Sequence, residues 1–149
     1  MQIKRMLVPV DGSARTERAI ETSIGLARQL GAVIVGFVAE TTGSTPPAAS
    51  APAGSPQGAA SEYDDDAAGP ALPVLARFEA AARAAGVPFE GVLDRVARVD
   101  QAIIAAAESQ RCDLIVMVTR GRGAFGEFLF GSQTKAVLAG CRLPLLVLH

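Results

Sequence analysis

Histidine and cysteine are scarce in this chain, and their scarcity excludes several kinds of site. The 149 residues include one histidine, His149 at the last position, and two cysteines, Cys112 and Cys141. Structural zinc needs four Cys or His ligands, and the cysteines form no C-x-x-C pair, so neither a zinc site nor a disulfide framework is expected. A Ser-His-Asp or Cys-His catalytic arrangement is not available either, because nothing pairs with His149. We therefore expect no catalytic residues, no resident metal site and two buried or half-buried thiols.

An excess of one charge and long apolar runs are also missing. Fourteen Lys and Arg stand against fifteen Asp and Glu, which gives a formal net charge of −1. Such a chain has no long-range attraction to nucleic acid or to an anionic membrane. No run approaches the roughly 18 apolar residues of a membrane span, and the start lacks the apolar core of a signal peptide. The sequence predicts a cytoplasmic protein with neither nucleic acid nor membrane as a partner.

Strand-like and helix-like segments alternate along the chain. Residues 32–39 (AVIVGFVA) form an almost continuous apolar run, typical of a strand covered on both faces, whereas 13–30 carries a helical apolar stripe and ends at Gly31, a natural C-terminal cap. The predicted strands are 3–10, 32–39, 87–95, 113–118 and 143–148, and the predicted helices are 13–30, 73–85 (closed by Gly86), 100–108 and 132–139 (closed by Gly140). This order predicts one α/β domain over 1–149, doubly wound, with a five-stranded parallel sheet flanked by about four helices.

The segment 41–70 interrupts this alternation. It is rich in Ala, Pro, Ser and Gly and has hardly any large apolar side chain. Such a segment cannot bury enough surface to offset the entropy of ordering it, so a flexible low-complexity loop is predicted. Asp64-Asp65-Asp66 near its end could be a metal site, but a solvated charge run is the commoner interpretation.

The most informative stretch is 117–132, MVTRGRGAFGEFLFGS. It leaves an apolar strand, carries four glycines and ends in Gly131-Ser132 at the start of a predicted helix. Glycine lets backbone N–H groups approach an anion, and a helix N-terminus offers unpaired donors with partial positive charge, so the stretch predicts anion binding. A plain surface turn is the alternative. Residues 121–126 also spell G-x-G-x-x-G, but no acidic residue follows about 20 positions on, and the Lys of a phosphate loop is missing, so both of those templates are rejected.

Three segments match a third template. They are Leu7-Val8-Pro9-Val10-Asp11-Gly12-Ser13 at the first strand, Gly121 followed after nine residues by Gly131-Ser132, and LPLLVL at 143–148. In these segments, and in the order of elements between them, the chain resembles the universal stress protein family over nearly its whole length except an insert near 41–70. Nucleotide-binding members of that family carry G-x2-G-x9-G-[ST] after the fourth strand. This chain has the second half of the pattern, with Val118 in place of the first glycine.

The resemblance implies a stress-response protein that binds ATP or an AMP-like ligand between its first and fourth strands, with Mg²⁺ accompanying ATP. The site residues that it implies are Pro9, Asp11, Val38, Met117, Val118, Gly121, Gly131, Ser132 and Gln133. Within this set, Pro9, Val38 and Met117 would line an adenine pocket, although each can equally be ordinary core. If the first and fourth strands are neighbours, as in the family, the loops that follow them face each other across the crevice where open parallel sheets bind ligands.

The polar residues of these loops each have two interpretations. Asp11 can accept hydrogen bonds from ribose or help to hold a divalent ion, or it can cap the following helix near Ser13. Ser132 can bind a phosphate oxygen or serve as the N-cap of its helix. Arg120 and Arg122 can neutralise phosphate, but solvated loop arginines are more frequent.

Val118 separates two hypotheses about function. A β-branched residue disfavours positive φ and fills space beside the backbone. The first hypothesis is a nucleotide-binding regulatory protein; the second is an interaction module of the same fold, with a remodelled pocket, that acts through its dimer surface or through 41–70. A slow ATP hydrolase using Asp11 and a metal ranks third.

The last predicted strand, 143–148, is apolar and has no covering segment after it. As a sheet edge it would leave backbone donors and acceptors open to unwanted pairing. The same strand from a second subunit would cover it across a two-fold axis. Both this argument and the resemblance predict a homodimer through the C-terminal strand.

Overall fold

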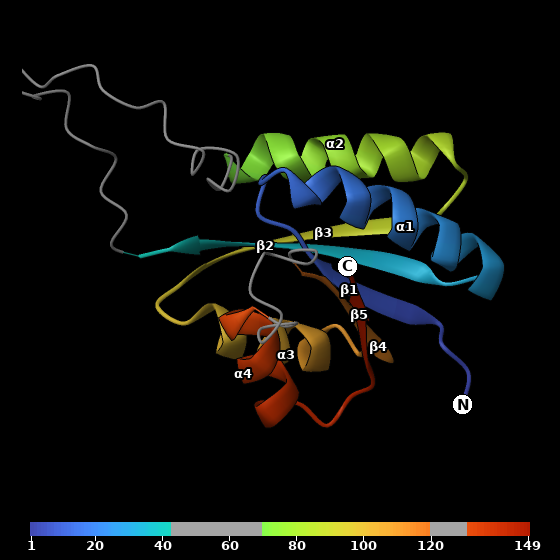
Figure 1. The fold of residues 1–149 in the computed structure, drawn as a ribbon. Helices are drawn as coiled ribbons and strands as arrows, with labels where there is room; N and C mark the ends of the chain where they lie inside the picture. The colour runs from blue at the N-terminus through green and yellow to red at the C-terminus, as the bar shows by residue number, and fades with distance from the viewer. Residues whose placement is uncertain (43–69, 120–130) are drawn as a thin grey trace, which may run out of the picture.

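Strands and helices alternate in the computed structural model, which describes residues 1–42, 70–119 and 131–149 (Figure 1). The strands are β1 (Arg5–Pro9), β2 (Val33–Thr41), β3 (Phe89–Val96), β4 (Leu114–Val118) and β5 (Leu145–Leu148). The helices are α1 (Arg15–Leu30), α2 (Ala71–Ala84), α3 (Val99–Ser109) and α4 (Ser132–Gly140). Residues 43–69 and 120–130, which make up most of the predicted loop 41–70 and of the glycine-rich stretch 117–132, lie outside the described residues.

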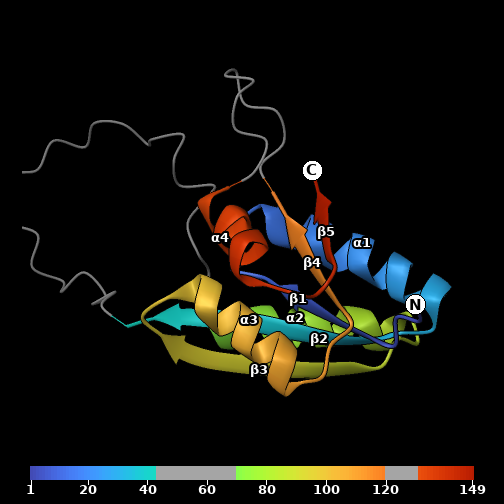
Figure 2. The ribbon, with the colours of Figure 1, turned by 90° about the horizontal axis from the view of Figure 1, so that it is seen from below.

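The five strands form one parallel sheet in the order β3-β2-β1-β4-β5. The chain builds outward from β1 to β2 and β3, then returns to the other side of β1 with β4, where Met6 lies opposite Leu114. Helices α1 and α2 cover one face of the sheet, and α3 and α4 cover the other (Figures 1 and 2). This confirms the doubly wound α/β fold and places the change of winding direction between β1 and β4.

Each face of the sheet has its own apolar core, because successive side chains of a strand point to opposite faces. In β1, Met6 and Val8 join the core under α1 and α2, whereas Leu7 joins the core under α3 and α4. Strand β2 alternates in the same way, with Val38 on the first side and Phe37 on the second. Strands buried on both faces explain why these runs are continuously apolar.

Several element ends differ from the sequence prediction. Helix α1 begins at Arg15 rather than 13, because Gly12 has a φ of +76° and the chain turns there before entering the helix. Strand β2 continues to Thr41, paired with β3. Helix α2 begins at Ala71, which places Pro73 in its first turn, where proline costs no helical hydrogen bond.

Two of the three predicted glycine stops are confirmed. Gly31 is the left-handed C-cap of α1 with φ +66°, and Gly86 follows α2 with φ +72°. The third prediction is wrong: Gly140 is the last residue of α4, and Cys141 caps the helix in an extended conformation.

Arg5 ties the amino end of the sheet together. Its guanidinium donates to both carboxylate oxygens of Glu90 at 3.0 and 2.6 Å, and its Nε donates to the carbonyl of Gln110 at 2.8 Å. The hydrogen bond from Arg5 lowers the pKa of the Glu90 carboxyl below its ordinary value. One side chain therefore links β1, β3 and the end of α3.

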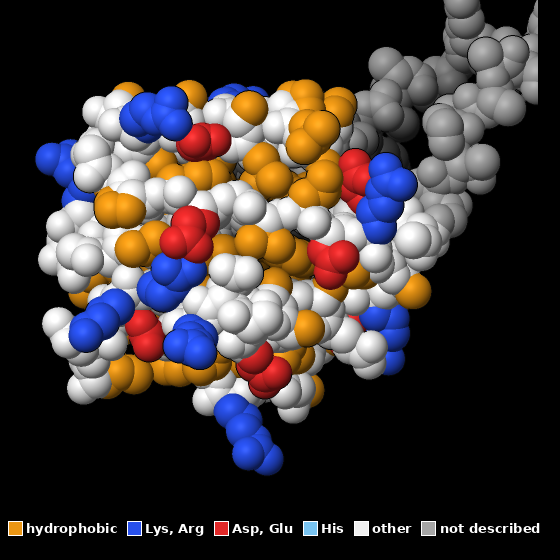
Figure 3. Space-filling view, turned by 180° about the vertical axis from the view of Figure 1, so that it is seen from behind, with side chains coloured by type: hydrophobic (Ala, Val, Ile, Leu, Met, Phe, Trp, Pro, Cys, Tyr) orange, Lys and Arg blue, Asp and Glu red, His pale blue; other side chains and the backbone are white. Residues whose placement is uncertain are grey.

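The described surface carries charges of both signs. On the face seen in Figure 3, Lys and Arg side chains alternate with Asp and Glu, so the described residues there form no continuous patch of one sign. Within the described ranges, no helix is both long and apolar enough to cross a membrane.

Candidate functional site

The loops after β1 and β4 leave neighbouring strands at the same end of the sheet. Strands β1 and β4 are paired directly, so the expectation that they are neighbours is confirmed. To one side of them lies β2 and to the other β5. In an open parallel sheet this is the place where the two windings diverge and leave a crevice outside the carboxyl ends of the strands.

A cavity of about 820 Å³ occupies this crevice. Its apolar lining comes from both sides of the sheet, with Phe37, Ile103 and Met117 from the core under α3 and α4, and Val10 and Ala19 from the core under α1 and α2. Polar groups come from the loop after β1 and from the first turns of α1 and α4. The described residues that line it are Pro9, Val10, Asp11, Arg15, Thr16, Ala19, Phe37, Ala39, Thr41, Val99, Ile103, Met117, Val118, Thr119, Gly131, Ser132, Gln133, Thr134 and Lys135.

Asp11 is held by its own loop. Its Oδ1 accepts a hydrogen bond from the backbone N–H of Ser13 at 3.0 Å and lies 3.5 Å from the hydroxyl of Thr16, which is buried. The same hydroxyl accepts from the N–H of Gly12 at 2.9 Å. The other oxygen, Oδ2, lies 3.6 Å from Nη2 of Arg15. The predicted contact with Ser13 is thus present, although the N-cap of α1 is Ala14, so Asp11 closes the loop before the helix.

The end of β4 is regular strand. Val118 lies opposite Leu148 of β5, and the N–H and hydroxyl of Thr119 both donate to the Leu148 carbonyl, at 2.8 and 3.3 Å. Among the described non-glycine residues, only Arg111 has a positive φ. Val118 therefore carries no left-handed strain, and its relevance to the cavity is the space that its side chain takes.

The first turn of α4 forms another wall of the cavity. Gly131 is the N-cap and Ser132 the first helical residue, so the alternative in which Ser132 is the N-cap is wrong. A glycine cap has no side chain that can accept from the first backbone N–H groups, and no side-chain cap bond is present. Ser132 and Gln133 bring these donors and their own polar groups to the cavity.

The structure brings together most of the residues implied by the sequence. Pro9, Asp11, Met117, Val118, Gly131, Ser132 and Gln133 all line the cavity. Val38 is 2 % exposed in the core under α1 and α2, while its neighbours Phe37 and Ala39 line the cavity, so its place in an adenine pocket stays a prediction. Gly121, Arg120 and Arg122 lie outside the described residues. The contacts of the remaining seven with a nucleotide stay a prediction.

Sequence reasoning missed other lining residues, above all Arg15 and Lys135. Each is an ordinary polar residue of a helix in the local sequence, and only the order of the strands brings the starts of α1 and α4 to one cavity. Phe37 and Ala39 were missed because residues 32–39 are apolar throughout, so the sequence does not reveal which of them point to which face.

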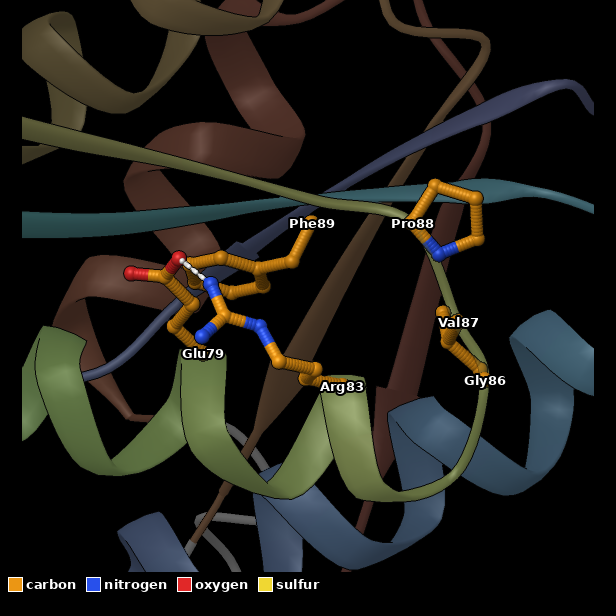
Figure 4. A pocket seen from close by; sticks show the side chains of 6 residues that line it. All are labelled: Glu79, Arg83, Gly86, Val87, Pro88 and Phe89. Atoms are coloured by element: carbon orange, nitrogen blue, oxygen red, sulfur yellow. Dashed lines mark hydrogen bonds and ion pairs between the residues drawn. The ribbon is translucent and has the colours of Figure 1, made fainter.

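A second, smaller hollow lies at the opposite end of the sheet. It measures about 320 Å³ and lies between the end of α2 and the start of β3, lined by Glu79, Arg83, Gly86, Val87, Pro88 and Phe89. Figure 4 shows Glu79 and Arg83 reaching toward each other from α2, and their ion pair of 2.7 Å neutralises both charges. The larger cavity is therefore the candidate site.

The chain is similar to known proteins in both sequence and fold. The model of the universal stress protein family matches residues 2–149. A universal stress protein of Thermus aquaticus, from the 3′ region of a sulfhydrylase gene, is 44 % identical over 64 residues, which are 43 % of this chain and 47 % of that protein. In fold, a universal stress protein in complex with cAMP has a TM-score of 0.68 at 21 % identity, covering 100 % of this chain and 98 % of that one. The universal stress protein of Archaeoglobus fulgidus in complex with dAMP has a TM-score of 0.63 at 19 % identity, with both chains covered fully (100 %). Because the family model spans almost the entire sequence, this chain belongs to the universal stress protein family.

Proposed function

We propose that this protein is a stress-response regulator that binds an adenine nucleotide in the cavity between β1 and β4. The observation that carries the proposal is the meeting of three features in one cavity: an apolar interior, the Asp11 loop and the glycine-capped start of α4. An apolar interior suits a purine base, and helix N-terminal donors suit a phosphate. Structures of similar fold hold cAMP and dAMP, which supports the same ligand class here.

The residues present fit such a ligand. A volume of about 820 Å³ lies within the range of roughly 300–1,000 Å³ usual for small-molecule sites. Phe37, Ile103 and Met117 would surround the base, and Asp11 would accept hydrogen bonds from ribose hydroxyls. With ATP, Asp11 would also be the carboxylate for Mg²⁺, an ion that proteins often bind through one or two carboxylates together with phosphate oxygens.

The residues that line the cavity favour a regulatory role over a catalytic one. Among the described residues that line the cavity, Asp11 is the one acidic side chain, and histidine and cysteine are not represented. Acid–base or nucleophilic chemistry would need a second positioned group. We infer that the nucleotide acts as a signal and that the protein works in the cytoplasm as a homodimer joined through β5.

The test is whether nucleotide binding depends on this cavity. Mass spectrometry of the purified protein should find adenine nucleotide, and calorimetry should measure binding of ATP with Mg²⁺ and of AMP. Ala39→Leu adds bulk inside the cavity and should weaken both ligands at least about tenfold, whereas Ala105→Leu, on the exposed side of α3, should leave both unchanged.

A competing function is supported by Val118, whose side chain takes up space in the cavity. In that case the protein is an interaction module that acts through its dimer surface, and the cavity serves no nucleotide. Absence of ATP and AMP binding at millimolar concentration, in a protein that is folded and dimeric, would favour this second function.

A further inference from the structure

One buried hydroxyl holds the loop between β1 and α1 (Figure 1). It belongs to Thr16, the second residue of α1, which is 2 % exposed and lines the cavity. The backbone N–H of Gly12 donates to this hydroxyl at 2.9 Å, and the hydroxyl donates to Oδ1 of Asp11 across 3.5 Å. Thr16 therefore holds both the carboxylate of Asp11 and the peptide group that directly follows it.

Packing within α1 does not require a hydroxyl at position 16. Valine has nearly the same shape, and burial of a hydroxyl costs free energy unless the group is hydrogen-bonded. The partners of Thr16 lie outside the helix, four and five residues earlier in the chain, where Gly12 has a left-handed φ of +76°. The hydroxyl thus stabilises the conformation of the loop that carries Asp11.

This loop fixes the orientation of the Asp11 carboxylate. Oδ1 accepts from the N–H of Ser13 at 3.0 Å as well as from Thr16, whereas Oδ2 makes the 3.6 Å ion pair with Arg15. The Asp11 side chain remains 51 % exposed. An ionised carboxylate has about four lone-pair sites, so these contacts orient it without exhausting its capacity to accept hydrogen bonds. Asp11 can therefore accept from a ligand hydroxyl in a fixed direction.

We propose that Thr16 is a positioning residue that sets the preference of the site for ribose hydroxyls. The inference rests on the proposed function, in which Asp11 accepts hydrogen bonds from the ribose, and it names the residue that holds Asp11 in place for them. A carboxylate that is oriented before binding loses less conformational freedom on binding, so its hydrogen bonds contribute more to affinity. The ligand class that follows is a nucleotide whose ribose carries free hydroxyls.

The experiment compares AMP with 2′,3′-dideoxy-AMP, which lacks both ribose hydroxyls. Calorimetry is carried out on the wild-type chain, on Thr16→Val and on Thr16→Ser, which keeps the hydroxyl. Ser23→Ala is the matched control, because Ser23 is a fully buried residue of the same helix that does not line the cavity and whose hydroxyl donates to the carbonyl of Ile20. Thermal unfolding shows whether each variant is folded, and Thr16→Ala replaces Thr16→Val if the valine variant is not.

The wild type should bind AMP at least about tenfold more tightly than 2′,3′-dideoxy-AMP, because hydrogen bonds to a carboxylate are strong. Thr16→Val should reduce this preference to about threefold or less by weakening AMP, and should change the affinity for 2′,3′-dideoxy-AMP by less than about twofold. Thr16→Ser should keep most of the preference and Ser23→Ala all of it. An unchanged preference in Thr16→Val would overturn the inference, and so would an equal loss of both ligands, because Thr16 would then act through packing alone.

Asp11→Ala shows whether Thr16 acts through the carboxylate. On its own this substitution should abolish the preference for AMP. Adding Thr16→Val to it should weaken AMP no further, because two residues that act through one interaction are not additive. A second, independent loss of AMP affinity in the double variant would contradict the inference.

The two ligands also separate this inference from the proposed function. If the wild type binds both equally well, the cavity holds a nucleotide but Asp11 does not recognise its ribose, and only the inference falls. If the wild type binds neither, the proposed function falls and the inference falls with it.

Discussion

Gly36 of β2 leaves the space that the ring of Phe89 fills. A Cβ atom at Gly36 would lie 2.5 Å from Cζ of Phe89, far inside van der Waals contact. The Phe89 ring also packs against Phe78 of α2, with ring centroids 4.9 Å apart. Gly36 lies opposite Gly91 in the sheet, so two adjacent residues without side chains form the floor under this aromatic pair. The relationship fixes how α2 and β3 pack on the edge of the sheet.

We expect Gly36→Ala to destabilise the protein by about 1–3 kcal/mol, the usual cost of overpacking a core. The ring of Phe89 must move, and the fully buried Phe78, 3.1 Å from the new Cβ, limits where it can go. Urea unfolding measures the change. Gly91→Ala is the matched control, because its Cβ would meet Phe89 at an ordinary 3.5 Å. Gly36→Ala combined with Phe89→Leu should regain part of the lost stability; equal stability of Gly36→Ala and wild type would show that the ring adapts without cost.

The fold could be predicted from the sequence because its signals are local. Each strand shows as an apolar run within a few residues, and helix α1 shows as an amphipathic stripe that ends at Gly31. The alternation of such strands and helices then indicates the fold class. The space above Gly36 could not be predicted in this way. Phe89 is distant in sequence and reaches Gly36 only through the pairing of β2 with β3.

Those residues of the candidate site that belong to local sequence motifs could also be predicted. Asp11, Val118 and Ser132 could be found from motifs that follow strands or open helices. The sequence could not show which face of the sheet Val38 and its neighbours take, because residues 32–39 have no polar alternation and a strand buried on both sides needs none. Arg15 and Lys135 resemble solvated helical residues until the strand order places both beside one cavity.

Val118→Gly should raise the affinity for ATP about tenfold, which corresponds to about 1.4 kcal/mol. The reason is relief of crowding, since Val118 has ordinary strand geometry and its side chain lines the cavity. Calorimetry with ATP and Mg²⁺ measures the gain. Val118→Ala is the control that separates side-chain crowding from backbone flexibility. Alanine removes most of the valine side chain but lacks the backbone conformational freedom of glycine. A gain with Gly but not with Ala would point to the backbone, and no gain with either would mean that residue 118 does not limit binding.

The buried thiol of Cys112 should make stability fall at alkaline pH. Burial raises the pKa of Cys112 from 9.0 to about 11, against the opposing effect of the Arg5 guanidinium, which favours the thiolate. Between pH 9 and pH 11 the unfolded chain releases this proton and the folded chain keeps it, so unfolding becomes easier as pH rises. A pKa raised from 9.0 to about 11 corresponds to a loss of about 2–3 kcal/mol at most across that window.

Urea unfolding at several pH values from 8 to 11, under reducing conditions, tests this sign. Cys112→Ala should lose stability less steeply with pH than the wild type, whatever its stability at pH 8. Cys141→Ala keeps the buried thiol and should follow the wild-type slope. Identical slopes in all three proteins would mean that Cys112 titrates normally in the folded state.

The edge strand β5 should join two subunits, and Val147→Lys should separate them. Strand β5 has β4 as its one neighbour in the described sheet, so its outer backbone groups are available for pairing. Leu146 and Leu148 pack on one core and Leu145 on the other, whereas Val147 belongs to neither and can be charged without opening the interior. Leu138→Lys, on an exposed side chain of α4, is the control for added surface charge. Light scattering at micromolar concentration should find a dimer for the wild type and for Leu138→Lys and a folded monomer for Val147→Lys; a monomeric wild type would refute the dimer, and a dimeric Val147→Lys would place the interface elsewhere.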